Sequence, residues 1–346
     1  MKKQITSIFK LFIGIFVLLL CFLSCKDNKK KEDVQEQAAE RQEQQEIITS
    51  PIHEGYYADP SVVKEGDTYY IYATIDPWGG EKLAVLETSD FKNFKTHKLN
   101  WPTKEACTSP TSKEAMVWAP DVIKAKNGKY YMYISVGSEI WVGESEKPLG
   151  PWKNAKEDKS PLIKSTLYPN YHMIDAQCFI DDDGQAYLYW GSGWDWVNGR
   201  CFAVKLKEDM VGFDGEIKNV TPPNYFEAPF MVKKDEKYYM MYSDGKAIDS
   251  TYKIRYSIGD NPFGPFKEEV NSPIAVTDAE KGIYGPGHHS VFKEKGQHYI
   301  LYHQIFPQDK DYVLRQLRLD SLNFSGNGEI EKINFKGIRP INKRNP

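Results

Sequence analysis

Three carboxylic acids at the start of similar segments are the residues of this sequence best suited to acid–base chemistry. Asp59 stands in the tripeptide ADP, Asp175 in the tetrapeptide MIDA and Glu227 in the tetrapeptide FEAP. Hydrolysis of a glycosidic bond with inversion needs one carboxylic acid that protonates the leaving oxygen and one carboxylate that deprotonates water on the opposite face. The two groups must lie roughly 6.5–9.5 Å apart, and a third carboxylate beside the acid would raise its pKa by like-charge repulsion. The alternative is that Asp59 and Asp175 are only turn residues in front of strands.

The segments around these acids repeat along the chain, and the repeat indicates how they could be brought together. Each copy has an acidic or imidazole residue, a short apolar strand, a polar hairpin and an aromatic strand. The leading residues Asp59, Asp121, Asp175, Glu227 and His288 are 62, 54, 52 and 61 positions apart. A period of roughly 50 to 60 residues with three or four strands per unit predicts an all-β fold, the five-bladed β-propeller. In such a fold the innermost strands surround one axis, so their leading residues would converge on one pocket.

The segments between these residues have the pattern of strands and hairpins. Residues 129–133 and 237–241 are aromatic-rich strands bounded by turn residues, and no amphipathic helix pattern separates the repeats, which disfavours a βαβ fold. The run DDDG at 181–184 lacks the spacing and the downstream glutamate of a calcium loop, and we expect a solvated hairpin turn there.

The ordered set of motifs resembles glycoside hydrolase family 43, the five-bladed propeller glycosidases. The likeness covers residues 56 to about 335 and rests on ADP, WAPDV, ID followed by F-x-DDDG, EAP, GPGH and a final Arg-x-Leu strand. The resemblance implies that Asp59 is the general base, that Glu227 is the general acid, and that Asp175 tunes the acid and orients the sugar. Where the family often has proline after the third-blade aspartate, this chain has Ala176.

The resemblance also implies two further site residues in the fifth repeat, a histidine and an arginine. His288 occupies the histidine position of GPGH, so the resemblance implies that it lies at the floor of the pocket and contacts a central Ca²⁺ through waters. A buried histidine with satisfied partners is the alternative. Arg315 matches the fifth-blade arginine, whose guanidinium fork could hold a sugar hydroxyl and bias the charge of the carboxylates.

Aromatic side chains are the expected partners of sugar rings, whose apolar faces stack on tryptophan. Trp78 follows the second strand of the first repeat, Trp118 lies next to Ala119, and Trp194 lies in a long loop of the third repeat. We expect these three to bind substrate, and most other aromatic residues to form the propeller core.

The first 25 residues are predicted to be an export signal. A lysine-rich start precedes the apolar run 11–23, which is shorter than the roughly 20 residues that span a bilayer. The run ends in LSC at Cys25, which resembles the lipobox of bacterial lipoproteins, where the cysteine is acylated after cleavage. An ordinary signal peptide with a chance cysteine is the alternative. Residues 26–50 lack aromatic residues and predict a flexible charged tether, and residues 51–346 the catalytic propeller domain.

Composition excludes several classes of protein. The chain has 346 residues, with 45 basic and 48 acidic side chains, which gives no reason to expect nucleic acid or an anionic membrane surface as partner. A mean hydropathy of −0.58 with one long apolar run excludes a polytopic membrane protein. Cys107, Cys178 and Cys201 are an odd, scattered set, which predicts buried thiols rather than disulfides or zinc ligands.

The sequence therefore predicts an exported, inverting glycosidase that acts on plant oligo- or polysaccharides bearing α-L-arabinofuranose or β-D-xylose. We expect an outer-membrane, cell-surface or periplasmic location, with membrane contact only through a lipid anchor. Two alternatives remain. One is a non-catalytic glycan-binding propeller, which would be expected to lack one of the three carboxylates. The other is a retaining fructan-hydrolase-like propeller, which is disfavoured because its acid motif is Glu-Cys and its second-blade motif Arg-Asp-Pro.

Overall fold

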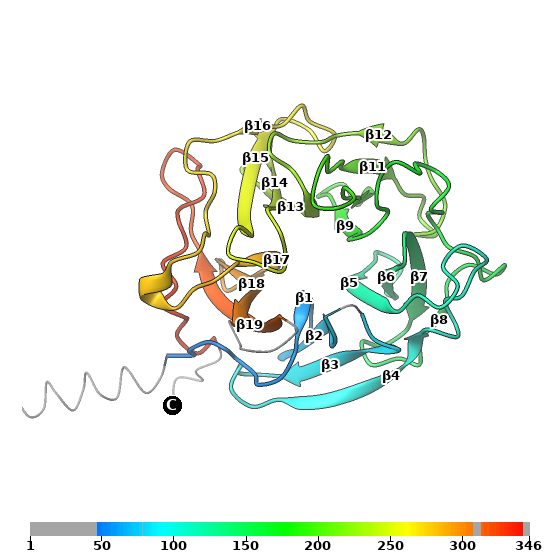
Figure 1. Ribbon diagram of the computed structural model, residues 1–346, viewed down its shortest axis with the longest axis horizontal. Helices are drawn as coiled ribbons and strands as arrows, with labels where there is room; N and C mark the ends of the chain where they lie inside the picture. The colour runs from blue at the N-terminus through cyan, green and yellow to red at the C-terminus, as the bar shows by residue number, and fades with distance from the viewer. Residues whose placement is uncertain (1–46, 78, 307–312, 342–346) are drawn as a thin grey trace, which may run out of the picture. The chain divides into compact units, whose positions relative to one another are not determined.

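Short aromatic-rich segments separated by turn residues pair with their neighbours along the chain, and they form five antiparallel sheets. The structure is a computed structural model that describes residues 47–77, 79–306 and 313–341. The five sheets surround one axis as the blades of a β-propeller (Figure 1). This arrangement confirms the predicted all-β, five-bladed fold.

The strands follow one another in chain order within each blade, and the first strand of each blade lies nearest the axis. The first blade comprises β1 (Ala58–Glu65), β2 (Thr68–Thr74), β3 (Lys82–Thr88) and β4 (Lys95–Thr103). The second comprises β5 (Val117–Lys124), β6 (Tyr130–Val136), β7 (Glu139–Ser145) and β8 (Lys153–Asn154). The third comprises β9 (Gln177–Ile180), β10 (Ala186–Trp190), β11 (Phe202–Lys205) and β12 (Lys218–Asn219). The fourth comprises β13 (Glu227–Lys234), β14 (Lys237–Asp244), β15 (Lys253–Gly259) and β16 (Lys267–Glu268). The fifth has β17 (Gly287–Glu294), β18 (Gln297–Phe306) and β19 (Leu314–Leu322), preceded by the 3₁₀ helix η1 (Ala279–Lys281).

Hydrophobic cores fill the spaces between neighbouring blades. Tyr133 of β6 and Trp190 of β10 belong to the core between the second and third blades, for example, and both are fully buried. A further core joins the fifth blade to the first, and there Ile48 pairs with Ile338 through a backbone hydrogen bond of 2.8 Å. The two ends of the described chain thus close the ring. Cys107, Cys178 and Cys201 are buried free thiols, as predicted.

Each blade has one residue with a left-handed backbone at the start of its innermost strand. These residues are Asp59, Ala119, Asp175, Ala228 and His288, with φ between 42° and 57°. In four blades the pairing register of the innermost strand shifts at this point, as in a β-bulge. The true repeat therefore differs from the predicted one at two of its five positions. Asp121 follows the left-handed residue of its blade by two positions, and Glu227 precedes the left-handed residue of its blade by one.

The left-handed residues also connect neighbouring blades. In four cases the backbone N–H donates to a side chain of the preceding blade's second strand: Ala119 to Thr74, Asp175 to Ser135, His288 to Ser243 and Asp59 to His303. In the third blade the acceptor position is Gly191, which has no side chain. There the backbone N–H of Ala228 instead interacts with the carboxyl of Asp175 and lowers its pKa, although burial outweighs this effect. One of the three predicted carboxyls thus stands beside the N–H that lacks a side-chain acceptor on the preceding blade.

Two other acidic residues have structural roles that the sequence did not reveal. Asp121 is buried, accepting hydrogen bonds from the hydroxyl of Ser61 at 3.2 Å and the backbone N–H of Cys178 at 2.8 Å. The run DDDG at 181–184 forms the predicted turn with Asp182 and Asp183 exposed, but Asp181 is buried and bonds to Lys233 at 2.8 Å. Both aspartates join innermost strands of neighbouring blades. No helix in the described ranges is long and apolar enough to cross a membrane.

Candidate active site

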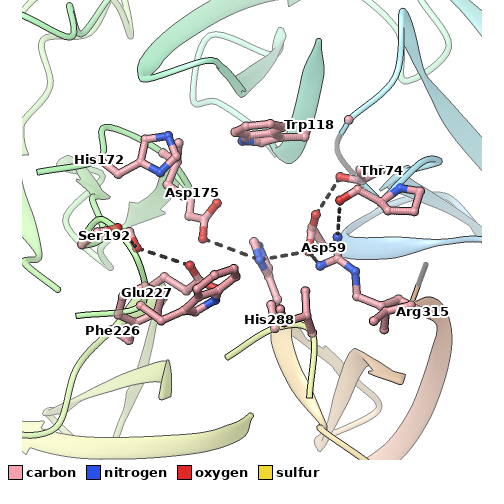
Figure 2. A pocket seen from close by; sticks show the side chains of 18 of the residues that line it. Asp59, Thr74, Trp118, His172, Asp175, Ser192, Phe226, Glu227, His288 and Arg315 are labelled. Carbon is pink, nitrogen blue, oxygen red and sulfur yellow. Dashed lines mark hydrogen bonds and ion pairs between the residues drawn. The ribbon is translucent and has the colours of Figure 1, made fainter. Parts of the chain in front are cut away.

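A cavity of about 520 Å³ opens at the propeller axis, and all three predicted carboxyls line it (Figure 2). Asp59 comes from the first blade, Asp175 from the segment before β9, and Glu227 from the start of β13. His288 and Arg315 of the fifth blade line the same cavity. The structure therefore brings together five residues that are spread over more than two thirds of the chain. The volume lies within the range of roughly 300–1,000 Å³ that is usual for small-ligand sites.

Asp59 is surrounded by hydrogen-bond donors. Nη1 of Arg315 lies 3.1 Å from its Oδ1, the hydroxyl of Thr74 lies 2.8 Å from its Oδ2, and Nδ1 of His288 lies 3.2 Å from Oδ1. Burial alone would raise the pKa of Asp59, but the Arg315 charge and these hydrogen bonds lower it below its ordinary value. Asp59 is therefore ionised across the physiological range.

Two histidines beside Asp59 are uncharged near neutral pH. Burial lowers the pKa of both His288 and His303 from the ordinary value. Nδ1 of His303 accepts the backbone N–H of Asp59 at 3.2 Å, so this nitrogen carries no proton. Arg315 is consequently the positive charge that keeps Asp59 ionised, and its own pKa is raised by Asp59.

Glu227, in contrast to Asp59, favours its protonated form. Its side chain is buried, Oε1 accepts the hydroxyl of Tyr252 at 2.8 Å, and Oε2 lies 3.3 Å from the hydroxyl of Ser192. Burial is the main cause that raises the pKa of Glu227 to about 7, and the negative charge of Asp59 adds to it. Glu227 is thus partly protonated near pH 7 and holds its proton at lower pH, where it can act as a proton donor.

Asp175 and Asp59 share a contact with one histidine. Oδ2 of Asp175 is 3.7 Å from Nδ1 of His288, the same nitrogen that contacts Asp59 (Figure 2). Burial, followed by the charges of Glu227 and Asp59, raises the pKa of Asp175 well above its ordinary value. Asp175 is therefore a neutral hydrogen-bonding group when Glu227 is protonated, and ionising either residue makes the other harder to ionise.

The combination of charge states determines what the site can do. One buried carboxylate that stays ionised can take a proton from water, and one buried carboxyl that stays protonated can give a proton to a leaving group. Hydrolysis of a glycosidic bond needs this pair.

Aromatic side chains form one wall of the cavity. Trp194 stacks on His172 with 4.1 Å between the ring centroids, and Trp118 meets His172 edge-on at 6.2 Å. Trp194 remains 44% exposed, which leaves a ring face available for a sugar. Two of the three predicted tryptophans therefore line the cavity. The third, Trp78, lies outside the described residues.

The predicted calcium ion depends on ligands that the described residues do not group together. Ca²⁺ takes six to eight oxygen ligands. In the ranges that the structure describes, no three His, Cys, Asp or Glu side chains are placed to hold a metal ion. Nδ1 of His288 faces Asp59 and Asp175. These residues do not form a direct calcium site, and an ion that His288 contacts through waters stays a prediction.

Several residues that line the cavity or contact its carboxyls carried no signal in the sequence. Tyr56 accepts Nε–H of Arg315 at 2.6 Å, and Ser192 and Tyr252 contact Glu227. His172 contacts two tryptophans. Each of them stands in a loop or strand end with no motif of its own. The one available signal was proximity in sequence for His172, which precedes Asp175 by three positions.

Comparison with a family model and with curated proteins finds glycoside hydrolases. Residues 48–330 match the family model described as glycosyl hydrolases family 43. The beta-D-galactofuranosidase xynD of Aspergillus niger is 32% identical over 302 residues, covering 83% of this chain and 85% of that protein. The xylosidase/arabinosidase of Bacteroides ovatus is 27% identical over 335 residues, covering 81% of this chain and 96% of that protein.

A solved structure agrees with the fold. The crystal structure of a thermostable family-43 glycoside hydrolase superposes with a TM-score of 0.68 at 28% identity. The alignment covers 84% of this chain and 96% of that one. The similarity therefore extends over the whole propeller rather than over a single blade.

Proposed function

Because the chain belongs to glycosyl hydrolase family 43, and is accordingly a glycoside hydrolase, we propose how its cavity residues carry out hydrolysis with inversion. Asp59 is the general base, Glu227 is the general acid, and Asp175 positions the acid. The observation that carries this proposal is that two carboxyls with opposite surroundings line one cavity. Asp59 contacts the guanidinium of Arg315 at 3.1 Å, which favours its ionised form, whereas Glu227 is buried beside two hydroxyls, and burial favours its protonated form.

The proposed reaction is a single displacement. Asp59 removes a proton from a water molecule that attacks the anomeric carbon. Glu227 donates its proton to the glycosidic oxygen as the bond to the leaving group breaks, and the anomeric configuration inverts. Arg315 contributes by preventing protonation of Asp59, and Trp194 offers a face on which the sugar stacks.

The proposed substrates are plant oligo- or polysaccharides that carry α-L-arabinofuranosyl or β-D-xylosyl units. Support comes from the relative in Bacteroides ovatus, which is named a xylosidase/arabinosidase. The relative in Aspergillus niger is named a beta-D-galactofuranosidase, so a furanoside of a hexose belongs in any substrate test.

Two measurements test the function. A panel of nitrophenyl arabinofuranosides, xylosides and galactofuranosides identifies the sugar that is released. Nuclear magnetic resonance of the first product then reports its anomeric configuration. Release of an inverted pentose is the expected result. A product with retained configuration, or no release from any member of the panel, would contradict the proposal.

We further propose that the enzyme is exported and anchored to a membrane by lipid at Cys25. Residues 1–46 lie outside the described part of the chain, so support for this comes from the sequence alone. An apolar run followed by LSC and a charged tether is the basis. Such an anchor would hold the propeller at the outer membrane or cell surface, or on the periplasmic side.

A further inference from the structure

A buried tyrosine that the proposed mechanism leaves without a role bonds directly to the general acid. Tyr252 lies in the loop before β15, and its side chain is fully buried. Its hydroxyl donates to Oε1 of Glu227 at 2.8 Å. Burial raises the pKa of Tyr252 well above its ordinary value, so this hydroxyl keeps its proton throughout the working pH range.

The hydroxyl of Tyr252 is the donor of this hydrogen bond, and Oε1 of Glu227 is the acceptor. Because the Tyr252 hydroxyl keeps its proton, this proton points to Glu227. A permanent donor at Oε1 makes Oε1 the acceptor oxygen of the protonated carboxyl. The Ser192 hydroxyl lies 3.3 Å from Oε2, but it can turn its proton to the Gly193 carbonyl at 3.4 Å, so Oε2 is the oxygen that can carry the acidic proton.

The chain makes room for this contact with a glycine. A Cβ atom at Gly287 would lie 1.9 Å from the Tyr252 ring, which no side chain tolerates. The ring of His303 also packs against Tyr252, in a stacked arrangement with 5.7 Å between the ring centroids and an interplanar angle of 10°. His303 in turn accepts the backbone N–H of Asp59. Tyr252 therefore packs against Gly287 of the GPGH motif and against His303, the histidine that holds the backbone of the general base Asp59.

We propose that Tyr252 is a positioning residue of the general acid: its hydroxyl holds Oε1 of Glu227, so that Oε2 carries the proton that the leaving group receives. This inference rests on the proposed function. When the proton moves from Oε2 to the glycosidic oxygen and the bond to the anomeric carbon breaks, Glu227 becomes a carboxylate. The Tyr252 hydrogen bond then stabilises the new negative charge.

The other titratable or charged groups around Glu227 among the described residues are Asp59, Asp175, Arg315 and Tyr225. Asp59 and Arg315 keep their charges across the working range, and Tyr225 stays neutral because burial raises its pKa well above the ordinary value. Asp175 is the one neighbour in this set whose titration is linked to that of Glu227. Measurements in an Asp175→Asn background therefore isolate the effect of Tyr252.

The test is Tyr252→Phe, which removes one oxygen atom and keeps the ring. Loss of a hydrogen bond to a charged group predicts a fall of roughly 10- to 100-fold in kcat/KM on a natural glycoside. On a 2,4-dinitrophenyl glycoside, whose leaving group departs without a proton, the fall is much smaller. The basic limb of the pH–rate profile moves to higher pH, because the acid loses a group that stabilises its ionised form.

A matched control and a second variant complete the experiment. The control is Tyr242→Phe, which removes a buried hydroxyl that bonds to the Pro223 carbonyl at 2.5 Å. This variant is expected to change neither kcat/KM on the two glycosides nor the basic limb of the pH–rate profile. Replacing Tyr252 by 3-fluorotyrosine keeps the volume and strengthens the donor, so the basic limb moves to lower pH. If Tyr252→Phe lost equal activity on both substrates and left the basic limb of the pH–rate profile unchanged, the inference would be overturned. An unchanged basic limb in the 3-fluorotyrosine variant would overturn it as well.

Failure of the inference and failure of the proposed function give different results. If Glu227→Ala shows no dependence on the leaving group, the acid is wrongly assigned and the function fails. If Glu227→Ala shows it and Tyr252→Phe does not, only the inference fails. In the Glu227→Ala background, Tyr252→Phe is expected to have no further effect on the natural glycoside, because the two residues act as one unit.

Discussion

Nη1 of Arg315 lies 3.1 Å from Oδ1 of Asp59, although the two residues are 256 positions apart in the chain. This contact joins β19, the last strand of the propeller, to β1, the first. Both residues are buried, and burial would otherwise favour the neutral form of the carboxyl. The closure of the ring therefore does two things at once: it joins the ends of the fold, and it sets the charge of the proposed base.

Arg315→Gln tests this dependence. Without the guanidinium charge, the pKa of Asp59 rises, and a base that must be ionised is lost as the pH falls. The acidic limb of kcat/KM moves to higher pH, and activity at pH 5 falls by roughly tenfold or more. Arg255→Gln is the control, because Arg255 bonds to Asp244 and Glu268 in the fourth blade. A limb that moves equally in both variants would contradict the assignment.

Cys25→Ser tests the proposed anchor. Acylation needs the thiol, so the variant should move from the membrane fraction to the soluble fraction, and its activity per molecule should not change. The measurement is recovery after detergent fractionation, with Cys201→Ser as a control that keeps the lipobox. Equal membrane recovery of wild type and Cys25→Ser would show that this cysteine is not the attachment point.

Glu227→Ala and Asp59→Ala separate acid from base. A general acid contributes roughly 10²- to 10⁴-fold, so Glu227→Ala should lose that factor on a natural glycoside and far less on a 2,4-dinitrophenyl glycoside. Asp59→Ala should lose activity on both substrates, since water still has to be deprotonated. Azide in the assay, which needs no deprotonation, should restore part of the Asp59→Ala activity. Equal losses in folded variants on both substrates would mean that the roles are wrongly assigned.

The fold and the three carboxyls could be predicted because they depend on local patterns. Strands of period two with turn residues recur at blade spacing, and a propeller directs the start of every blade to one axis. The exact position of each residue within its repeat could not be predicted, since a β-bulge inserts residues without a sequence signal. The sequence pattern therefore aligns Asp121 with Asp59, whereas in the structure Ala119 occupies the position equivalent to Asp59.

The remaining parts of the site depend on contacts between distant loops. Tyr252 is one of 22 tyrosines, and no spacing distinguishes it from those in the cores. Its role follows from the absence of a side chain at Gly287 and from the position of Glu227, which are properties of the assembled blades. The burial of Asp181 at the start of the predicted turn has the same cause, because its partner Lys233 comes from the next blade.

Asp121→Asn and Asp121→Ala test a structural role for the misaligned aspartate. Loss of the acceptor in Asp121→Ala leaves the N–H of Cys178 buried without a partner, and the free energy of unfolding should fall by about 1–3 kcal/mol. The ratio of activities on natural and activated glycosides should stay unchanged. A changed ratio in folded protein would place Asp121 in the catalytic machinery.

The pH dependence of stability gives an independent check on Asp121. Burial raises its pKa to about 7 in the folded protein, so the folded state holds a proton that the unfolded state releases. The contribution of this group to stability is therefore present at low pH and is lost as the pH rises toward 7. Asn cannot titrate, so urea unfolding at pH 5 and pH 7.5 should show a smaller pH dependence for Asp121→Asn than for the wild type.

Asp175 offers the sharpest separation of positioning from charge. Its carboxyl interacts with the backbone N–H of Ala228, the residue that follows Glu227, at the place where Gly191 offers no side-chain acceptor. Asparagine keeps an acceptor oxygen and loses the titration, whereas alanine loses both. If Asp175 is neutral when Glu227 titrates, Asp175→Asn should retain the basic limb of the pH–rate profile and much of the activity. Asp175→Ala should lose roughly tenfold more, since an unpartnered N–H beside the acid costs about 1–3 kcal/mol.

The comparison is made on kcat/KM with a natural and an activated glycoside, and melting temperatures confirm that both variants are folded. Because Asp175→Ala displaces the acid, its additional loss should appear mainly on the natural glycoside. A basic limb that moves to lower pH in Asp175→Asn would show that Asp175 is ionised in the active enzyme. The like-charge repulsion expected from the sequence would then contribute to the pKa of Glu227, together with burial and Asp59.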